Sequence, residues 1–189
     1  MSSQAVPSIA EIGGMSPVEL ELLARGLDGE RRRVEAALAT LVHRVDMAGA
    51  FTGDGHRSVK AWGRATCNWS GGEAGRFVKT GRMLAKYASA AIAAAAGRLG
   101  VAQMHALGQL VGNPRVAEHL AASEELLVSQ ASLLDYDDYI TLLAHWEALA
   151  DADGAHSDHE RAHRERRAHL SIVGERVYLD ATGGATAGV

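Results

Sequence analysis

The sequence predicts an all-α protein, a multi-helix bundle with a small β-hairpin near its C-terminal end. Hydrophobic residues make up 47% of the 189 residues and aromatic residues only 5%, so the apolar content is largely Ala and Leu, which favour helix. Apolar residues also recur at steps of three and four along most of the chain, and a strand-like pattern follows only near its end. The length suits one main domain with its own hydrophobic core.

Changes in composition predict four segments. Residues 1–15 contain Ser, Gly and Pro without periodicity, and we expect a mobile leader there. A helical domain is expected over 16–169 and a hairpin over 170–180, where apolar residues flank Gly-Glu-Arg. Residues 181–189 carry no signal for regular structure and resemble a linker or the cut end of a longer protein.

The first helix is predicted to start at Ser16, because Pro17 and Glu19 complete a strong N-terminal signal. Asp28 and Gly29 are a candidate interruption, after which residues 30–47 predict a long amphipathic helix. Three nearby glycines are expected to end it: Gly49, Gly53 and Gly55.

Residues 54–86 predict two helices around a short turn, and the rest of the domain is organised around them. Ser58 is expected to cap the first helix, and residues 67–69 form the bend. Ser70 and Glu73 form a capping box, in which each side chain bonds the other residue's backbone amide. The second helix has an apolar stripe and a separate cationic face.

Later segments predict further helices. An alanine helix is expected over 88–96, another from Val101 to Gly112, a short one over 114–121, and one starting at Ser123. Asp135 is expected to cap a helix whose Trp and Leu stripe lies in the core. Residues 151–154 end the acidic region, and a polar helical segment follows.

Charge is distributed unevenly along the chain. Residues 57–86 carry seven cations and one acid, a net charge of +6, although the whole chain has −4. Residues 116–160 contain eleven acids and no Lys or Arg. Such asymmetry points to nucleic acid. Two alternatives are that each set of charges solvates a helix face, or that the two halves pair with each other or between subunits. The candidate nucleic-acid-binding residues are Arg57, Lys60, Arg64, Arg76, Lys79, Arg82 and Lys86.

The order of several short motifs resembles the actinobacterial 13E12-repeat family, whose shared region is domain of unknown function 222. The motifs, in chain order, are LVHRVDMAGA, GHRSVKAW, SGGEAGR, GRLGVAQ, LLVSQA, W-x-x-x-x-D-x-D-G and ERR-x-x-LS. The resemblance covers about residues 16–180. It implies association with DNA-acting proteins, because many members carry an HNH nuclease motif further along the chain. No HNH residues carry over, since the sequence stops just after the hairpin and has one cysteine.

No recognisable catalytic or metal-binding constellation is present in the sequence. His156, His159 and His163 follow helical spacing, but neighbouring arginines would repel a cation, so a solvated charged helix is the preferred interpretation. Cys67 has no clear histidine partner and is interpreted as a structural thiol. We therefore expect no metal, cofactor or small-molecule ligand, and no catalysis by the residues of this chain.

The sequence contains neither an export signal nor a membrane span. Its N-terminus lacks a basic segment followed by an apolar run, and no stretch approaches the roughly 18 apolar residues of a spanning helix. A single cysteine fits a reducing compartment, so a cytoplasmic location is expected.

These observations favour a non-catalytic helical module that binds DNA or accompanies a DNA-acting protein. The first alternative is an interaction module that forms a homo-oligomer or docks a partner protein through complementary charge. The second is the N-terminal part of an HNH nuclease whose catalytic part lies outside this sequence.

Overall fold

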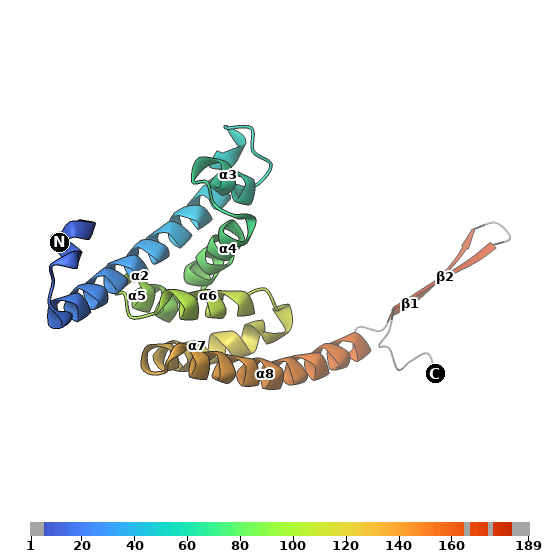
Figure 1. The fold of residues 1–189 in the computed structure, drawn as a ribbon. Coiled ribbons are helices and arrows are strands. Elements are labelled where there is room, and N and C mark those ends of the chain that lie inside the picture. Colours follow the sequence, from blue (N-terminus) through green and yellow to red (C-terminus); the bar gives the residue numbers. More distant parts are fainter. Residues whose placement is uncertain (1–5, 165–166, 174–175, 183–189) are drawn as a thin grey trace.

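The computed structural model describes the backbone of residues 6–164, 167–173 and 176–182, and the side chains of residues 6–152. It confirms the all-α class (Figure 1). The α-helices are α1 (Ile9–Gly13), α2 (Pro17–Ala48), α3 (Val59–Thr66), α4 (Gly71–Lys86), α5 (Ala88–Ala95), α6 (Val101–Leu110), α7 (Ala117–Leu133) and α8 (Tyr136–Arg164). Two short 3-10 helices are η1 (Ala50–Thr52) and η2 (Pro114–Val116).

Two strands follow α8 in the region where the sequence predicts a hairpin. Strand β1 (Arg167–Val173) pairs antiparallel with β2 (Arg176–Thr182), with Leu170 opposite Leu179. Strand β1 begins before the predicted hairpin of residues 170–180. Residues 167–169, which the sequence assigns to the helical domain, therefore belong to β1.

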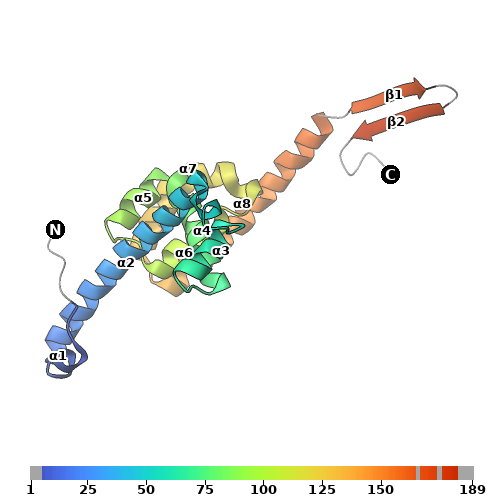
Figure 2. The same ribbon diagram turned by 90° about the horizontal axis from the view of Figure 1, so that it is seen from above.

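Helix α4 lies between α2 and α6 and packs against both. The core lies where these three helices meet α5, α7 and α8, and its largest fully buried side chains include Tyr139, Met83 and Met104. Burial raises the pKa of the Tyr139 hydroxyl. Seen from above, the start of α2 and the end of α8 project from the body on opposite sides (Figure 2).

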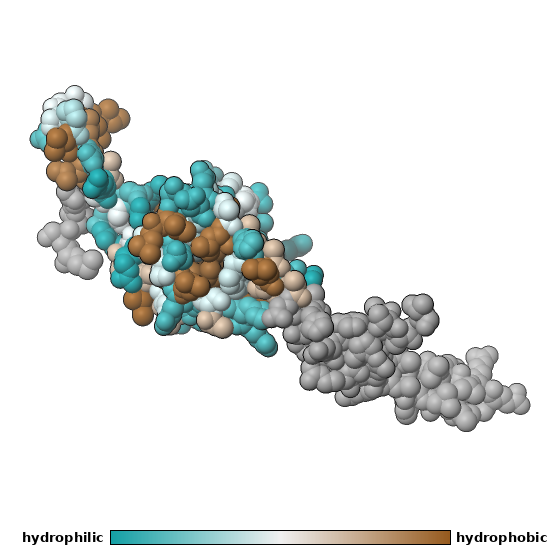
Figure 3. All heavy atoms as spheres, turned by 90° about the horizontal axis from the view of Figure 1, so that it is seen from below, coloured by the Kyte–Doolittle hydropathy of each residue, from teal (hydrophilic) through white to brown (hydrophobic). Residues whose placement is uncertain are grey.

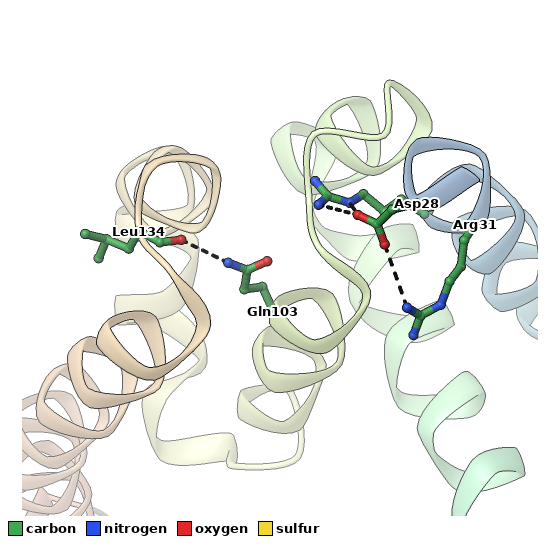
Figure 4. Close-up of polar contacts among 5 residues, drawn as sticks. Asp28, Arg31, Gln103 and Leu134 are labelled. Carbon is green, nitrogen blue, oxygen red and sulfur yellow. Dashed lines mark hydrogen bonds and ion pairs between the residues drawn. The ribbon is translucent and has the colours of Figure 1, made fainter. Parts of the chain in front are cut away.

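Helix α2 runs without a break through Asp28 and Gly29, so the candidate interruption is wrong. The carboxylate of Asp28 pairs with Arg32 at 2.5 Å, one turn further on, and with Arg31 at 3.7 Å (Figure 4). Pairs at this spacing stabilise a helix by a few tenths of a kcal/mol each. Together with the apolar positions on both sides, they offset the roughly 1 kcal/mol that a glycine costs in a helix.

Three other boundaries differ from the sequence-based expectation. Residues 9–13 of the expected leader form α1, because Ser8 and Glu11 make the same capping box as Ser16 and Glu19. Helix α7 begins at Ala117 and passes through Ser123, which is therefore no helix start. The helix that Asp135 precedes and the polar segment after residues 151–154 are one helix, α8.

Polar contacts hold the later helices to the central ones. The side-chain amide of Gln103 in α6 donates to the carbonyl oxygen of Leu134 at 3.1 Å, at the turn between α7 and α8 (Figure 4). Glu124 of α7 accepts from the backbone amides of Ser89 and Ala90 at 2.5 and 3.2 Å, which caps α5. The helices after α4 thus form one body with it.

Among the described residues, no helix is both long enough and apolar enough to cross a membrane.

Gly81 sets the distance between α2 and α4. A β-carbon at this position would lie 2.3 Å from the carbonyl oxygen of Ala39 and 3.0 Å from the β-carbon of His43. Both are atoms of α2 that cannot turn aside, so any larger residue would force the two helices apart.

Gly81→Ala is therefore expected to lower the free energy of unfolding by about 1–3 kcal/mol or more, measured by urea denaturation, because overpacking outweighs the gain in helix propensity. Gly72→Ala is the control. Its new β-carbon meets only flexible side-chain atoms at 4.0 Å, so stability should stay unchanged or rise slightly. Equal stability of the two variants would contradict the close contact.

Candidate nucleic-acid interface

The two helices α3 and α4 are joined by a turn with a defined geometry. Ser58 caps α3 by accepting from the amide of Ala61 at 3.2 Å, and Asn68 in the turn adopts a positive φ of 55°. The Trp69 ring then packs against Phe77, with 4.4 Å between ring centroids. It lies so close to Gly63 that a β-carbon there would meet the ring at 2.8 Å. This contact fixes α3 against α4.

The predicted capping box at the start of α4 is confirmed. The amide of Glu73 donates to the Ser70 hydroxyl at 3.1 Å, and the amide of Ser70 donates to the Glu73 carboxylate at 3.4 Å. Glu73 is the one acid between residues 57 and 86. Because its carboxylate bonds back to the helix start, it forms no ion pair with a described cation.

All seven predicted cations are exposed. Three of them make contacts with neighbouring groups. Lys79 donates to Gln109 of α6 at 2.5 Å, Arg82 lies 3.4 Å from the carboxylate of Asp46 in α2, and the Lys86 ammonium lies 5.3 Å from the centre of the Tyr87 ring. Within the described part of the chain, the other four form neither an ion pair nor a side-chain hydrogen bond: Arg57, Lys60, Arg64 and Arg76.

The fold brings most of these cations onto one side of α3 and α4. At about 100° per residue, Lys79, Arg82 and Lys86 fall within an arc of about 60°, opposite the buried Phe77. Lys60 of α3 reaches the same side, because a β-carbon on Gly75 would lie 3.8 Å from its ammonium nitrogen. Arg64 follows Lys60 by one turn of α3 and therefore lies next to it.

Arg76 lies at the edge of this group, three residues before Lys79 on α4. It lines a groove of about 500 Å³ between α2, α4, α6 and α8, together with Arg31, His105 and Gln109. His105 is held by Glu35, with 2.7 Å between Nε2 and the carboxylate oxygen. Arg31 is 67% exposed. No spacing rule links Arg31 to Arg76, since their proximity depends on how α2 packs against α4.

The acidic residues lie toward the other end of the helical body. Figure 1 shows α3 at one end and α7 with α8 at the other. Some acids there have local partners: Glu147 accepts from Asn113 at 3.3 Å, and Asp151 lies 3.4 Å from Arg115. Among the described side chains, no ion pair joins an acid of α7 or α8 to any of the seven cations. Among the described side chains, the acidic residues of α7 and α8 therefore do not pair with the predicted cations of the same chain.

The described side chains contain no cluster of three or more His, Cys, Asp or Glu residues that could hold a metal ion. His156, His159 and His163 lie on α8, but their side chains are outside the described part. Cys67 is exposed, in the turn before α4.

Replacing Ser70 with alanine tests the capping box. The first two residues of α4 are glycines, which lose the most conformational entropy on folding, so the helix start depends on its cap. We expect Ser70→Ala to lower the free energy of unfolding by about 1 kcal/mol in urea denaturation. Ser70→Asp keeps an acceptor oxygen and should retain most of the stability. An unchanged free energy of unfolding in the Ser70→Ala protein would show that the cap does not contribute to stability.

Comparison with known proteins places the chain in a family. No curated protein and no solved structure is similar enough to match it. A family model described as "Domain of unknown function (DUF222)" matches residues 21–175, from the first turns of α2 to just past β1. Since the match spans nearly all of the helical domain, the protein belongs to the DUF222 family.

Proposed function

We propose that this domain is a non-catalytic module that binds DNA through its phosphate backbone, with the α3–α4 surface as the interface. The observation that carries the proposal is the exposure of all seven cations on one helix–turn–helix unit with a net charge of +6. Lys60, Lys79, Arg82 and Lys86 form its centre on a shared side. Arg64 extends it along α3, Arg57 lies just before that helix, and Arg76 with Arg31 flanks it at the neighbouring groove.

The existing contacts of these cations would not prevent binding. The Arg82–Asp46 pair joins side chains that are 58% and 27% exposed, and pairs of this kind contribute about 0–1 kcal/mol. Lys79 bonds a neutral amide, so its charge remains uncompensated. Cations bound to phosphate displace condensed counterions, which gives affinity that falls steeply with salt and depends little on sequence.

The acidic end of the molecule would orient DNA on this surface. The exposed acids of α7 and α8 include Glu118, Glu125 and Asp137, and they would repel a phosphate backbone. DNA would therefore approach the α3–α4 end and avoid the opposite one.

The resemblance to 13E12-repeat proteins supports the same role. Many of those proteins carry an HNH nuclease motif beyond the helical domain, and a phosphate-binding module beside a nuclease would hold the substrate near the catalytic part. In that setting the domain supplies general DNA affinity in the cytoplasm of an actinobacterial cell, and cleavage belongs to the other part.

The test is fluorescence anisotropy of a labelled duplex at two salt concentrations. The variant Arg76→Glu/Lys79→Glu/Arg82→Glu removes three candidate contacts. The plot of log affinity against log salt should lose a slope of about 2.7, because each phosphate contact contributes about 0.9. Affinity at low salt should fall for duplexes of any sequence.

The matched control reverses three exposed arginines elsewhere, Arg25→Glu/Arg98→Glu/Arg115→Glu, and changes net charge by the same amount. We expect a much smaller loss of DNA affinity, because this variant changes the net charge of the protein but leaves the α3–α4 surface intact. If both variants lose affinity equally, net charge alone explains binding. If the unaltered protein binds no duplex at low salt, the proposal is wrong.

A further inference from the structure

Helix α2 carries a second apolar stripe that the core does not use. Its buried residues, Ala36, Ala39 and Val42, face α4 and α6 and all lie in its C-terminal half. The second stripe repeats at alternating steps of three and four residues, which is the spacing of a coiled-coil seam. We define the seam as Leu20, Leu23, Leu27, Glu30, Val34, Ala37, Leu41, Arg44 and Ala48, of which all but Glu30 and Arg44 are apolar.

Much of the seam is exposed. The exposed fraction is 39% for Leu20, 55% for Val34 and 47% for Leu41. The first half of α2 and α1 form an N-terminal arm, residues 9–30, that projects from the body and carries further exposed residues, Ile9 at 91% and Leu22 at 66%. Figure 3 shows apolar side chains gathered on this arm. Apolar residues exposed on a projecting helix suit a partner surface, and packing on such a surface would stabilise the arm.

The C-terminal half of the same seam borders a hollow. A groove of about 600 Å³ lies between α2, α4 and α5, and its lining includes Ala37, Leu41 and Arg44 of the seam with Ala85 and Ala91 opposite. The lining is mainly apolar with small side chains, so it can accept a helix at close range. One chain thus presents a protruding apolar arm and an apolar groove on the same helix.

We propose that two copies of this chain pair through antiparallel α2 helices, with the arm of each copy seated on the groove of the other. A two-fold interface requires a self-complementary surface, and an arm and a groove at opposite halves of one helix meet this requirement. The seam spacing gives a register with Leu23 opposite Leu41 of the other copy. Leu27 then lies opposite Ala37, and Leu20 opposite Arg44, whose aliphatic stem can cover it.

The charge of α2 also favours the antiparallel direction. Residues 17–30 contain four acids and one arginine, a net charge of −3, and residues 31–44 contain four arginines and one glutamate, a net charge of +3. Antiparallel pairing sets the acidic half of one helix beside the basic half of the other, whereas parallel pairing would align like charges. Some of these charges also pair within the helix, as Glu21 does with Arg25 and Glu30 with Arg33. Such exposed pairs are weak and leave the opposite net charges of the two halves unchanged.

The first experiment is sedimentation equilibrium over a range of protein concentrations without DNA. We expect the unaltered chain to approach the mass of two copies at high concentration, and its dissociation constant to rise with salt. Val34→Glu/Leu41→Glu should raise that constant at least about a hundredfold, because it places one glutamate opposite Glu30 and another opposite Leu23 of the other copy. Both positions are about half exposed in one copy, so circular dichroism and the urea midpoint should stay near those of the unaltered protein.

The control is Leu126→Glu/Leu133→Glu, which charges two apolar residues of α7 that are 58% and 77% exposed. It should associate like the unaltered protein. A single-copy mass of the unaltered protein at all concentrations would overturn the proposal, and so would loss of association in the α7 variant alone.

Cysteine cross-linking tests the direction and register. In a Cys67→Ser background, Leu23→Cys and Leu41→Cys proteins are oxidised with copper phenanthroline separately and as a mixture. The register predicts a disulfide-linked pair mainly in the mixture. Efficient cross-linking of either protein with itself would indicate a parallel pair and would overturn the antiparallel arrangement.

Discussion

Two close approaches of helix α4 to its neighbours hold the helical body together. On one side Gly81 lies against the backbone of Ala39 in α2, and on the other Gly108 of α6 lies against the backbone of Thr80, where a β-carbon would meet Thr80 at 3.2 Å. Backbones at such short range bring many side-chain atoms into contact, and dispersion attraction sums over them. The positions of α2 and α6, and of the elements attached to them, follow from these contacts.

The same arrangement determines which side of α4 faces water. With neighbours on two sides, α4 buries a wide arc that includes Thr80 and Met83, and an outer strip remains exposed, with Arg76 and Ala85 also exposed at its two edges. Lys79, Arg82 and Lys86 occupy that strip. Because the turn at Asn68 and the Trp69–Phe77 contact hold α3 beside it, Lys60 joins the strip. Core packing and the cationic surface are thus two consequences of one helix position.

Features that depend on neighbouring residues could be predicted from the sequence, such as the caps at Ser16, Ser58 and Ser70. Features that depend on a balance between a local break signal and the packing of the whole helix could not be predicted in this way. Gly29 and Ser123 both signal a break, yet helical periodicity on both sides outweighs each signal. The burial of Thr80 was not predicted, because one apolar stripe suggests one neighbour and α4 has two. The cationic face of α4 followed from helical spacing, but the shared groove that brings Arg76 near Arg31 depends on tertiary packing.

The proposed pairing of α2 helices constrains how two copies could hold DNA. In the register with Leu23 opposite Leu41, the two-fold axis passes near residue 32, so each α2 ends about 24 Å from it at 1.5 Å per residue. The two α3–α4 units, which follow those ends, would start about 48 Å apart. Paired helix-turn-helix readers span one helical turn of DNA, about 34–36 Å, to reach symmetric half-sites on one face. Helix α4 packs back along α2, with Gly81 against Ala39 and Arg82 beside Asp46, so the two cationic strips lie closer to the axis than the ends of α2. Phosphate contacts from the two strips need no symmetric sequence between them.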